Sequence, residues 1–314
     1  EPCMQQPYLS IVVPVYNEET NLESLMARLY PVVQGMGKPF EIILTDDGSR
    51  DRSLEILRQM VRDFPGVKVV EFNGNFGQHM AILAAFEMSR GEIVITLDAD
   101  LQNPPEEIPK LVQKMEEGCD VVGSIRQKRQ DTLFRRAASR IVNITTNKMT
   151  GMRMKDYGCM LRAYHRNVIE NINRCQETTT FIPALAQTFA SNPCEVEVSH
   201  AERAAGESKY SLYKLIRLNF DLMTGFSVVP LQLFALFGIL TSILSLAFAL
   251  FLLIRRFIVG AEVEGVFTLF AILFFFIGII ILGIGIVGEY VGRIYQEVRK
   301  RPRYVVRRTY GFEE

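Results

Sequence analysis

The sequence predicts an α/β protein with a mostly parallel sheet and flanking helices, joined to two transmembrane helices. Two observations predict this class. Short apolar runs rich in β-branched residues alternate with segments of helical periodicity through the first half of the chain, a pattern typical of a parallel sheet. Two later segments, 230–254 and 265–287, are apolar and contain no charged residue. At 314 residues the chain has room for about two domains.

The first half of the chain is expected to form strands and helices in alternation. Runs of strand length are separated by stretches in which apolar residues recur at helical spacing. The expected strands are 9–16, 40–45, 67–72, 92–97 and 120–124, and the expected helices are 20–29, 53–60, 77–88 and 106–117. In sheets of this kind, ligands bind at the carboxyl ends of the strands.

Acidic residues follow the strand 92–97. Asp98 and Asp100 come directly after it, and Gln102 lies two residues further on. Carboxylate and amide oxygens suit a small divalent cation such as Mg²⁺, which leaves coordination positions for substrate phosphate oxygens. The alternative is a polar junction between strand and turn that binds nothing. The flanking residues and the acids at the neighbouring strand ends favour the metal site.

Two further strands also end in acidic residues. Asp46 and Asp47 close the second strand, where a carboxylate can accept hydrogen bonds from a base or a ribose. Asp47 and Gly48 also form a common turn dipeptide, so a plain turn is the alternative. Glu18 follows the first strand and is a weaker candidate, since it also fits a solvated loop. His79, early in an expected helix, is given a local structural role.

Charge and cysteine content limit the classes of function. The chain has 35 Lys and Arg against 35 Asp and Glu, so its net charge gives no reason to expect a nucleic-acid partner. The five cysteines, at positions 3, 119, 159, 175 and 194, form no C-x-x-C pair. We expect reduced thiols in a cytosolic domain. No cleavable signal peptide is expected before the first strand.

Two basic amphipathic segments are expected to lie on membrane lipids. The segment 131–149 has apolar residues at helical spacing with arginines between them, which predicts an interface helix. A solvated basic face on an ordinary helix is the alternative. The segment 209–228 has the same character and leads into the first apolar span, so it is expected to be a juxtamembrane amphipathic helix.

The segments 230–254 and 265–287 each exceed the roughly 20 apolar residues that cross a membrane. The tail 289–314 is basic, which predicts a cytoplasmic location, and two spans place the domain 1–208 on the same side. Glu289 and Arg293 are expected to form an ion pair. The run 304–306 is expected to form a short strand that pairs with a neighbouring subunit, which favours a homo-oligomer.

Three motifs resemble a known family. They are Val-Pro-Val-Tyr-Asn-Glu at 13–18, Asp-Asp-Gly-Ser at 46–49 and Asp-Ala-Asp-Leu-Gln at 98–102. Together they resemble the family 2 inverting glycosyltransferases, whose fold is the Rossmann-like GT-A fold. With two carboxy-terminal spans and the motif at 288–295, the chain is similar to the polyprenyl-phosphate glycosyltransferases over nearly its whole length.

The resemblance implies a UDP-sugar donor, an undecaprenyl phosphate acceptor and a Mg²⁺ or Mn²⁺ cofactor. It implies that Asp98, Asp100 and Gln102 bind the metal. The implied nucleotide contacts are Pro14, Tyr16, Glu18, Asp46, Asp47, Asp98, Ala99 and Asp100. The implied catalytic residues are Asp98 and Asp100 with four arginines near the lipid phosphate, Arg126, Arg136, Arg140 and Arg203.

Longer stretches, among them 75–79 and 206–210, resemble one narrower group within this family and imply the identity of the sugar. The implied sugar is 4-deoxy-4-formamido-L-arabinose. The resemblance also implies transfer with inversion at the cytoplasmic face of the bacterial inner membrane, for lipid A modification and polymyxin resistance. The alternatives are transfer of glucose, another hexose or an N-acetylhexosamine, and a non-catalytic membrane protein that binds nucleotide. A processive polysaccharide synthase is disfavoured, because its Gln-x-x-Arg-Trp motif needs tryptophan and the chain has none. No role is assigned to residues 156–158, because their spacing alone does not indicate their chemistry.

Overall fold

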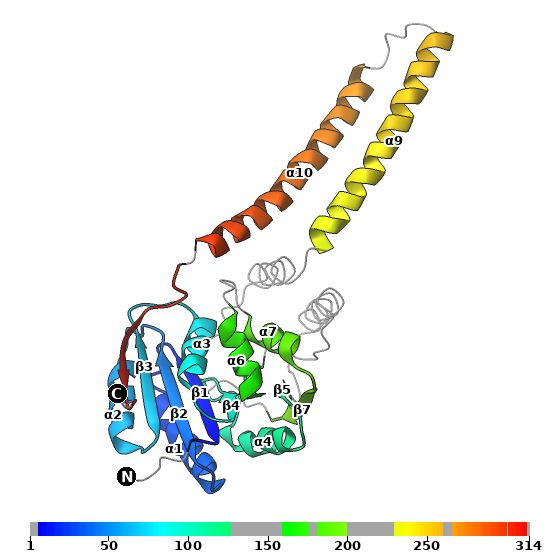
Figure 1. Cartoon of the computed structure of the whole chain (residues 1–314). Coiled ribbons are helices and arrows are strands. Elements are labelled where there is room, and N and C mark those ends of the chain that lie inside the picture. The colour runs from blue at the N-terminus through cyan, green and yellow to red at the C-terminus, as the bar shows by residue number, and fades with distance from the viewer. Residues whose placement is uncertain are drawn as a thin grey trace. The chain divides into compact units, whose positions relative to one another are not determined.

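The computed structural model describes residues 6–126, 159–175, 181–199, 229–259, 266–299 and 301–312. Within these ranges eight strands form one sheet in the order β7-β5-β6-β4-β1-β2-β3-β8 (Figure 1). The strands are β1 (Leu9–Val15), β2 (Phe40–Asp46), β3 (Val67–Phe72), β4 (Ile93–Thr96), β5 (Val121–Arg126), β6 (Arg162–His165), β7 (Pro193–Val198) and β8 (Val306–Tyr310).

The mostly parallel sheet expected from the sequence is confirmed. Strands β4, β1, β2 and β3 are parallel neighbours, and β5 is parallel to β7. Two strands run the other way: β6 lies between β4 and β5, and β8 pairs with β3 at the edge of the sheet. With four residues, β6 is too short to show a reliable pattern in the sequence.

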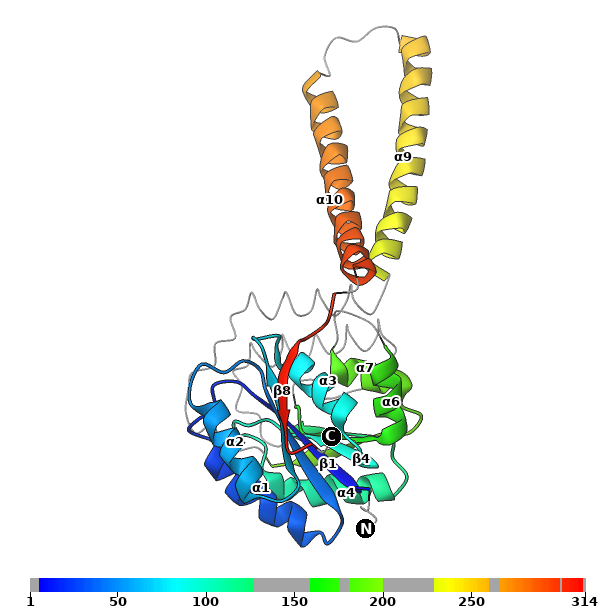
Figure 2. The same ribbon diagram turned by 60° about the vertical axis from the view of Figure 1, so that its left-hand side comes forward.

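Helices cover both faces of the sheet (Figures 1 and 2). They are α1 (Leu22–Gly35), α2 (Ser53–Asp63), α3 (Gln78–Met88), α4 (Ile108–Glu116) with the preceding 3₁₀ turn η1 (Pro105–Glu107), α6 (Arg166–Arg174) and α7 (Ile182–Phe189). Residues of α1, α2 and α4 share one core cluster with Ile11 and Val13, and residues of α3, α6 and α7 share the other with Val12. Because β1 is buried on both faces, its sequence is apolar at every position except Ser10 rather than alternating.

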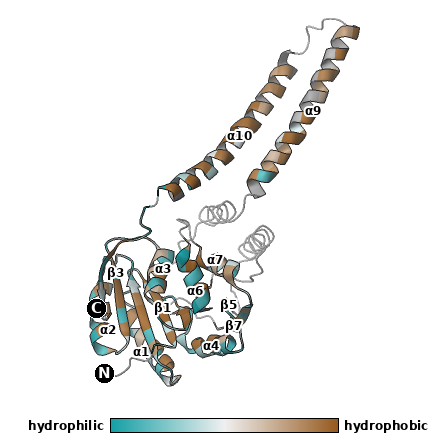
Figure 3. Ribbon diagram, viewed as in Figure 1, coloured by the Kyte–Doolittle hydropathy of each residue, from teal (hydrophilic) through white to brown (hydrophobic). Residues whose placement is uncertain are grey.

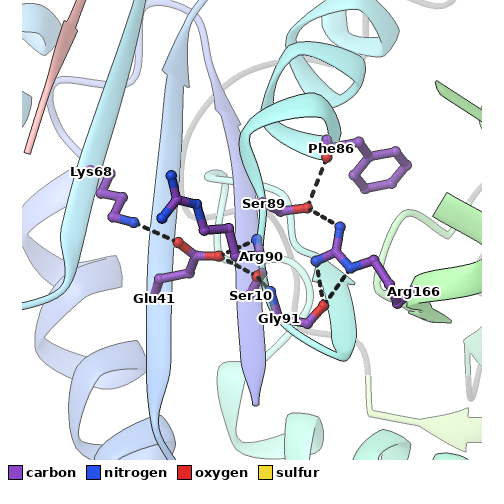
Figure 4. A network of polar contacts seen from close by, with 8 residues as sticks. All are labelled: Ser10, Glu41, Lys68, Phe86, Ser89, Arg90, Gly91 and Arg166. Carbon is purple, nitrogen blue, oxygen red and sulfur yellow. Dashed lines mark hydrogen bonds and ion pairs between the residues drawn. The ribbon is translucent and has the colours of Figure 1, made fainter. Parts of the chain in front are cut away.

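A buried polar network holds the amino ends of the strands, opposite to the ends where the acidic residues lie (Figure 4). Glu41 is its centre and is 2% exposed. Its carboxylate accepts hydrogen bonds from the Ser10 hydroxyl at 2.6 Å, the Arg90 backbone N–H at 2.7 Å and Lys68 Nζ at 2.8 Å. A Cβ at Gly91 would come within 2.6 Å of the Ser10 nitrogen, so this crossing needs glycine.

The carboxy-terminal strand completes the sheet of its own chain. The run 304–306 was expected to pair with a neighbouring subunit, but the strand begins at Val306 and β8 pairs antiparallel with β3 of the same chain. Such pairing between segments far apart in sequence leaves no local signal. The homo-oligomer therefore stays a prediction, without this strand as its support.

Two cysteines that were expected to be reduced are joined. Cys119 and Cys194 form a disulfide between residues 75 positions apart, with Cα atoms separated by 6.0 Å. Because β5 and β7 are parallel neighbours, Val122 lies opposite Cys194, and the residues just before β5 come close to β7. Sequence spacing does not reveal this pairing. Cys159 and Cys175 are outside this disulfide: the Cys159 thiol donates to Asn103 Oδ1 at 3.5 Å, and the Cys175 thiol donates to the Asn171 carbonyl at 3.4 Å.

The chain divides into two compact units. One comprises Glu1–Tyr210 with Arg301–Glu314, and the other Ser211–Lys300. The second contains the long helices α9 (Val229–Val259) and α10 (Val266–Val298), which are largely apolar (Figure 3). Among the described residues, one helical stretch, Phe275–Tyr295, is long and apolar enough to cross a membrane, and Leu231–Thr241 is a shorter apolar stretch. The expected span 230–254 stays a prediction.

Helices α9 and α10 approach each other closely within their unit. A Cβ at Gly283 of α10 would collide with the ring of Phe234 in α9, so glycine allows the contact. The expected ion pair in α10 is confirmed, with Arg293 Nη2 lying 2.9 Å from Glu289 Oε1. The segments 131–149 and 209–228, expected to be interface helices, lie outside the described residues.

Candidate active site

The acidic residues singled out in the sequence gather at one edge of the sheet. Asp46 is the last residue of β2 and pairs with Val15, the last residue of β1. On the other side of β1, Thr96 ends β4 only two residues before Asp98. Because β1, β2 and β4 are parallel neighbours, the loops that follow them open on the same side, as in other α/β ligand sites.

Asp47 is buried and held by the loop between β3 and α3, residues 73–77, called here the β3–α3 loop. Its two carboxylate oxygens accept backbone N–H bonds from Phe76 at 2.6 Å and Gly77 at 2.9 Å. Burial raises the pKa of Asp47, and the two N–H groups oppose that rise. A Cβ at Gly48, which has φ of +70°, would lie 2.5 Å from the carbonyl carbon of Gly74. Glycine is therefore required where these loops meet.

Asp46 lies deeper, at 1% exposure. Burial raises its pKa, and the nearby carboxylate of Glu71 adds to the effect, while hydrogen bonding from Ser49 opposes it. The Ser49 backbone N–H donates to both carboxylate oxygens of Asp46 at 3.3 Å. Its hydroxyl accepts the backbone N–H of Asn17 at 3.0 Å, so the loops after β1 and β2 are joined.

The loop after β1 presents the remaining expected nucleotide contacts. Glu18 accepts a hydrogen bond from Asn21 Nδ2 at 2.6 Å, and its backbone N–H donates to Ser53 Oγ at 2.9 Å. Tyr16 is 43% exposed at the rim of this edge, whereas Pro14 lies within β1. Asn17 has φ of +55°, a left-handed conformation that asparagine tolerates better than most residues.

Asp98 and Asp100 are both partly exposed on the loop after β4, and Ala99 between them is buried. Gln78, the first residue of α3, donates from Nε2 to Asp98 Oδ1 at 2.6 Å. The Gln102 backbone N–H donates to Asp100 Oδ1 at 3.1 Å. Leu101 has φ of +61°, a strained conformation for this residue type, and such strain is concentrated at functional sites.

This loop has the chemistry of a divalent cation site. Two carboxylates and the Gln102 carboxamide offer oxygen ligands of the kind that Mg²⁺ and Mn²⁺ accept. No group of three or more His, Cys, Asp or Glu residues in the described part of the chain is arranged to hold a metal. Two carboxylates and one carboxamide leave coordination positions for substrate and water, which suits an ion that also binds the substrate.

Two residues of the site were missed from the sequence. Gln78 links the loop after β4 to the β3–α3 loop, and hence Asp98 to Asp47. The segment 75–79 is among the longer stretches whose resemblance implies the identity of the sugar, but nothing in its spacing indicates this contact. Arg162 in β6 is fully buried, and its Nε donates to the carbonyl of Cys159 at 2.8 Å. It pairs in register with Thr96, so it lies close to the same edge.

His79 packs within the protein, as its expected structural role requires. Its ring meets Phe181 edge-on, with 5.3 Å between centroids. Part of the residue reaches the surface, but Nδ1 is buried and has no hydrogen-bond partner in the described structure. Burial lowers the pKa of His79 to about 4, so the imidazole is neutral at physiological pH.

The expected lipid-phosphate arginines are largely outside the described structure. Arg126 ends β5, where its backbone pairs with Val198 of β7. Arg136, Arg140 and Arg203 lie outside the described residues, as do residues 156–158.

Comparison with known sequences identifies the class of protein to which this fold and its acidic edge belong. Residues 10–172 match the family model described as glycosyl transferase family 2, and the chain belongs to this family. It is therefore a glycosyltransferase. The chain is 53% identical over 304 residues to the undecaprenyl-phosphate 4-deoxy-4-formamido-L-arabinose transferase of Pseudomonas aeruginosa strain LESB58, covering 96% of this chain and 90% of the relative. It is 52% identical to the enzyme of that name from Edwardsiella ictaluri, covering 95% and 93%.

Solved structures support the GT-A fold. The chain resembles glucosyl-3-phosphoglycerate synthase from Mycobacterium tuberculosis, solved with Mn²⁺, UDP and glucosyl-3-phosphoglycerate. The TM-score is 0.52 at 20% sequence identity, covering 69% of this chain and 78% of that one. At this level of identity the likeness concerns the fold alone.

Proposed function

We propose that this enzyme transfers 4-deoxy-4-formamido-L-arabinose from UDP to undecaprenyl phosphate, with inversion at the anomeric carbon. The observation that carries the proposal is the identity of 53% to an enzyme of that name over 96% of this chain. The product is the lipid-linked sugar used to modify lipid A, which connects the enzyme to polymyxin resistance.

The donor lies at the carboxyl edge of β1, β2 and β4. Asp47, backed by the N–H groups of Phe76 and Gly77, faces the uridine together with Asp46 and Glu18. Pro14, Tyr16 and Ala99 supply the remaining nucleotide contacts. These roles are supported by the position of the residues at one edge of the sheet and by the buried hydrogen bonds that orient Asp47.

Asp98, Asp100 and Gln102 would hold Mg²⁺ or Mn²⁺ against the diphosphate. When bound, the ion would neutralise charge on the departing UDP. The hydrogen bond from Gln78 fixes the orientation of Asp98, and the Gln102 N–H fixes Asp100. Such prior orientation matters because a misplaced ligand weakens a metal site.

The acceptor requires no general base. A phosphate monoester has its second pKa near 6, so its oxygens already carry the negative charge needed to attack. The enzyme must then bring together the lipid phosphate and the UDP-sugar, which are both anions, and align them. Arg126, Arg136, Arg140 and Arg203 are proposed to hold the lipid phosphate, because guanidinium groups bind phosphate with two parallel hydrogen bonds. Correct alignment contributes much of the rate.

The reaction takes place at the cytoplasmic face of the bacterial inner membrane. The support is the apolar stretch Phe275–Tyr295 and the basic character of the segment after α10. Two spans, 230–254 and 265–287, with interface helices at 131–149 and 209–228, form the proposed membrane-associated part. The domain 1–208 and the tail 289–314 are then cytoplasmic.

The deciding experiment uses the purified full-length enzyme, undecaprenyl phosphate and a panel of UDP-sugars. We expect efficient transfer from the UDP donor of 4-deoxy-4-formamido-L-arabinose, and little from UDP-glucose or UDP-N-acetylhexosamines. Preference for one of those hexose donors would replace the proposed sugar while keeping the reaction class.

Asp100→Ala tests the acidic loop. Transfer should be abolished, because the ion loses an oxygen ligand, while the protein stays folded and membrane-bound. The matched control is Asp63→Ala at the end of α2. The Asp63 carboxylate is exposed and accepts a hydrogen bond from Gln59 on the protein surface. Near-normal turnover by Asp100→Ala with the metal chelated would contradict the metal role.

A further inference from the structure

The segment after α10 does more than cover the edge of the sheet. Before β8 begins, the carbonyl of Val305 accepts the backbone N–H of Asn73 at 3.1 Å, so pairing continues into the β3–α3 loop. The guanidinium of Arg303 donates to the carbonyl of Cys175, just after α6. The segment 303–310 is therefore attached to the catalytic domain along its length (Figures 1 and 2).

Tyr304 bridges the two elements that flank the β3–α3 loop. Its ring stacks on Phe72 at the end of β3, with centroids 5.0 Å apart and planes 14° from parallel. Its hydroxyl hydrogen-bonds to Glu87 of α3, and burial with this carboxylate raises the pKa of the phenol. One side chain thus ties the strand before the loop to the helix after it.

The contact continues into the site through Phe76. Phe72 meets Phe76 edge-on, with centroids 5.6 Å apart. Phe76 supplies the 2.6 Å N–H bond to Asp47 Oδ1, and Gln78 two residues later supplies the 2.6 Å bond to Asp98. The chain of contacts from Tyr304 therefore ends on the acids of both the nucleotide and the metal part of the site.

The segment 303–310 also supplies partners for Glu71, a buried carboxylate beside Asp46. Glu71 is 2% exposed and pairs in register with Asp46. Tyr310 donates its hydroxyl to Glu71 Oε2 at 2.7 Å, and Arg307 lies 3.3 Å from Oε1. Burial raises the pKa of Glu71, but hydrogen bonds from Tyr310 and Arg58 outweigh that effect and lower it, which keeps this acid ionised.

We propose that Tyr304 is a positioning residue for donor binding, which holds the β3–α3 loop in the shape that orients Asp47 and Asp98. The segment following the membrane helices is then part of the donor site without touching the donor. The inference rests on the proposed function in one respect, namely that Asp47 and Asp98 serve the UDP-sugar.

The test compares Tyr304→Ala, Tyr304→Phe and the matched control Thr309→Ala in the full-length enzyme. Thr309 lies five residues after Tyr304, in β8, and its side chain is exposed. The affinity for UDP, the KM for UDP-sugar and the KM for undecaprenyl phosphate are measured. We expect Tyr304→Ala to weaken UDP binding and raise the donor KM about three- to tenfold, the range expected for lost aromatic packing, with the acceptor KM unchanged. Tyr304→Phe keeps the ring stack and should restore most of the affinity.

Hydrogen exchange without ligand gives an independent readout. Peptides covering residues 73–78 should exchange faster in Tyr304→Ala than in the wild type, while peptides of β1 and β2 keep their protection. Unchanged UDP affinity together with unchanged exchange would overturn the proposal, and so would an equal rise in both KM values. If Tyr304→Ala does not fold, Tyr304→Leu provides the same comparison with the apolar volume kept. Failure of the wild type to bind UDP would refute the proposed function, and the exchange comparison would still test Tyr304.

Discussion

Asp47 shows how one side chain can organise several segments. Both of its carboxylate oxygens accept backbone N–H groups, from Phe76 and Gly77, and Asn75 Nδ2 donates to its backbone carbonyl at 3.2 Å. A carboxylate with these surroundings cannot turn away, so the proposed nucleotide would meet it in a fixed orientation. The hydrogen bonds also offset the burial that raises its pKa. Orientation before binding reduces the entropy that the complex must lose.

His79 gives a prediction on pH at the residue scale. Its pKa falls from 6.5 to about 4 on folding because the ring is buried. Between these values the unfolded chain binds a proton that the folded chain does not, so stability decreases as the pH falls from 6.5 toward 4. The shift corresponds to about 3 kcal/mol at the acid end. His79→Phe should remove this part of the pH dependence, measured as the melting temperature in detergent at pH 7.5 and pH 5.

The control for this measurement is His165→Asn. His165 caps α6 by accepting the Asn167 backbone N–H, a role that asparagine also fulfils. The control should melt with the pH dependence of the wild type. If His79→Phe lost as much stability as the wild type between pH 7.5 and pH 5, burial of His79 would not be the cause of the acid destabilisation.

At the scale of elements, the two ends of the parallel strands have different tasks. The carboxyl ends carry the acids of the site, whereas the amino ends are joined by the network around Glu41 (Figure 4). Glu41→Ala should lower the free energy of unfolding by about 3 kcal/mol, because it leaves Lys68 and two other donors without their acceptor. UDP affinity should not change, since the site is at the opposite ends.

Glu116→Ala is the matched control for the Glu41 measurement. Glu116 also pairs with a lysine, Lys38, but its side chain is 44% exposed. An exposed pair contributes little to stability because water screens it, so this variant should unfold nearly as the wild type does. Denaturant unfolding of both variants checks the difference, and equal losses would show that burial is not what makes Glu41 important.

The elements also show what the sequence could predict. The first four strands lie in apolar runs with helices between them, so their succession along the chain and the position of their terminal acids at one edge followed from local pattern. The strands β6, β7 and β8 did not, because their positions depend on partners distant in sequence. The link from Gln78 to Asp98 spans 20 residues and two loops, and no spacing rule indicates it.

At the scale of the whole molecule, the Cys119–Cys194 bond can be tested against the proposed cytoplasmic location of the domain. Protein purified without reductant should resist alkylation at these two cysteines while Cys159 and Cys175 react after denaturation. Adding reductant should lower the stability by about 4 kcal/mol, because opening a loop of this length frees the unfolded chain.

Thiol labelling by mass spectrometry and thermal melting check the two parts of this prediction. Reductant should have no effect on the stability of Cys119→Ser. Alkylation of Cys119 in the purified, unreduced protein would show that the bond is not formed. Because the cytosol keeps thiols reduced, alkylation of Cys119 in rapidly quenched cells is the result that the cytoplasmic location predicts.

The position of β8 along the chain sets an order of assembly during synthesis. Ribosomes make α9 and α10 before β8, so the sheet cannot gain its last strand until both apolar helices have been translated. Until then β3 is an open edge with unpaired backbone groups. If Tyr304 holds the β3–α3 loop as proposed, a nascent enzyme reaches its full affinity for the sugar donor only after its membrane helices exist.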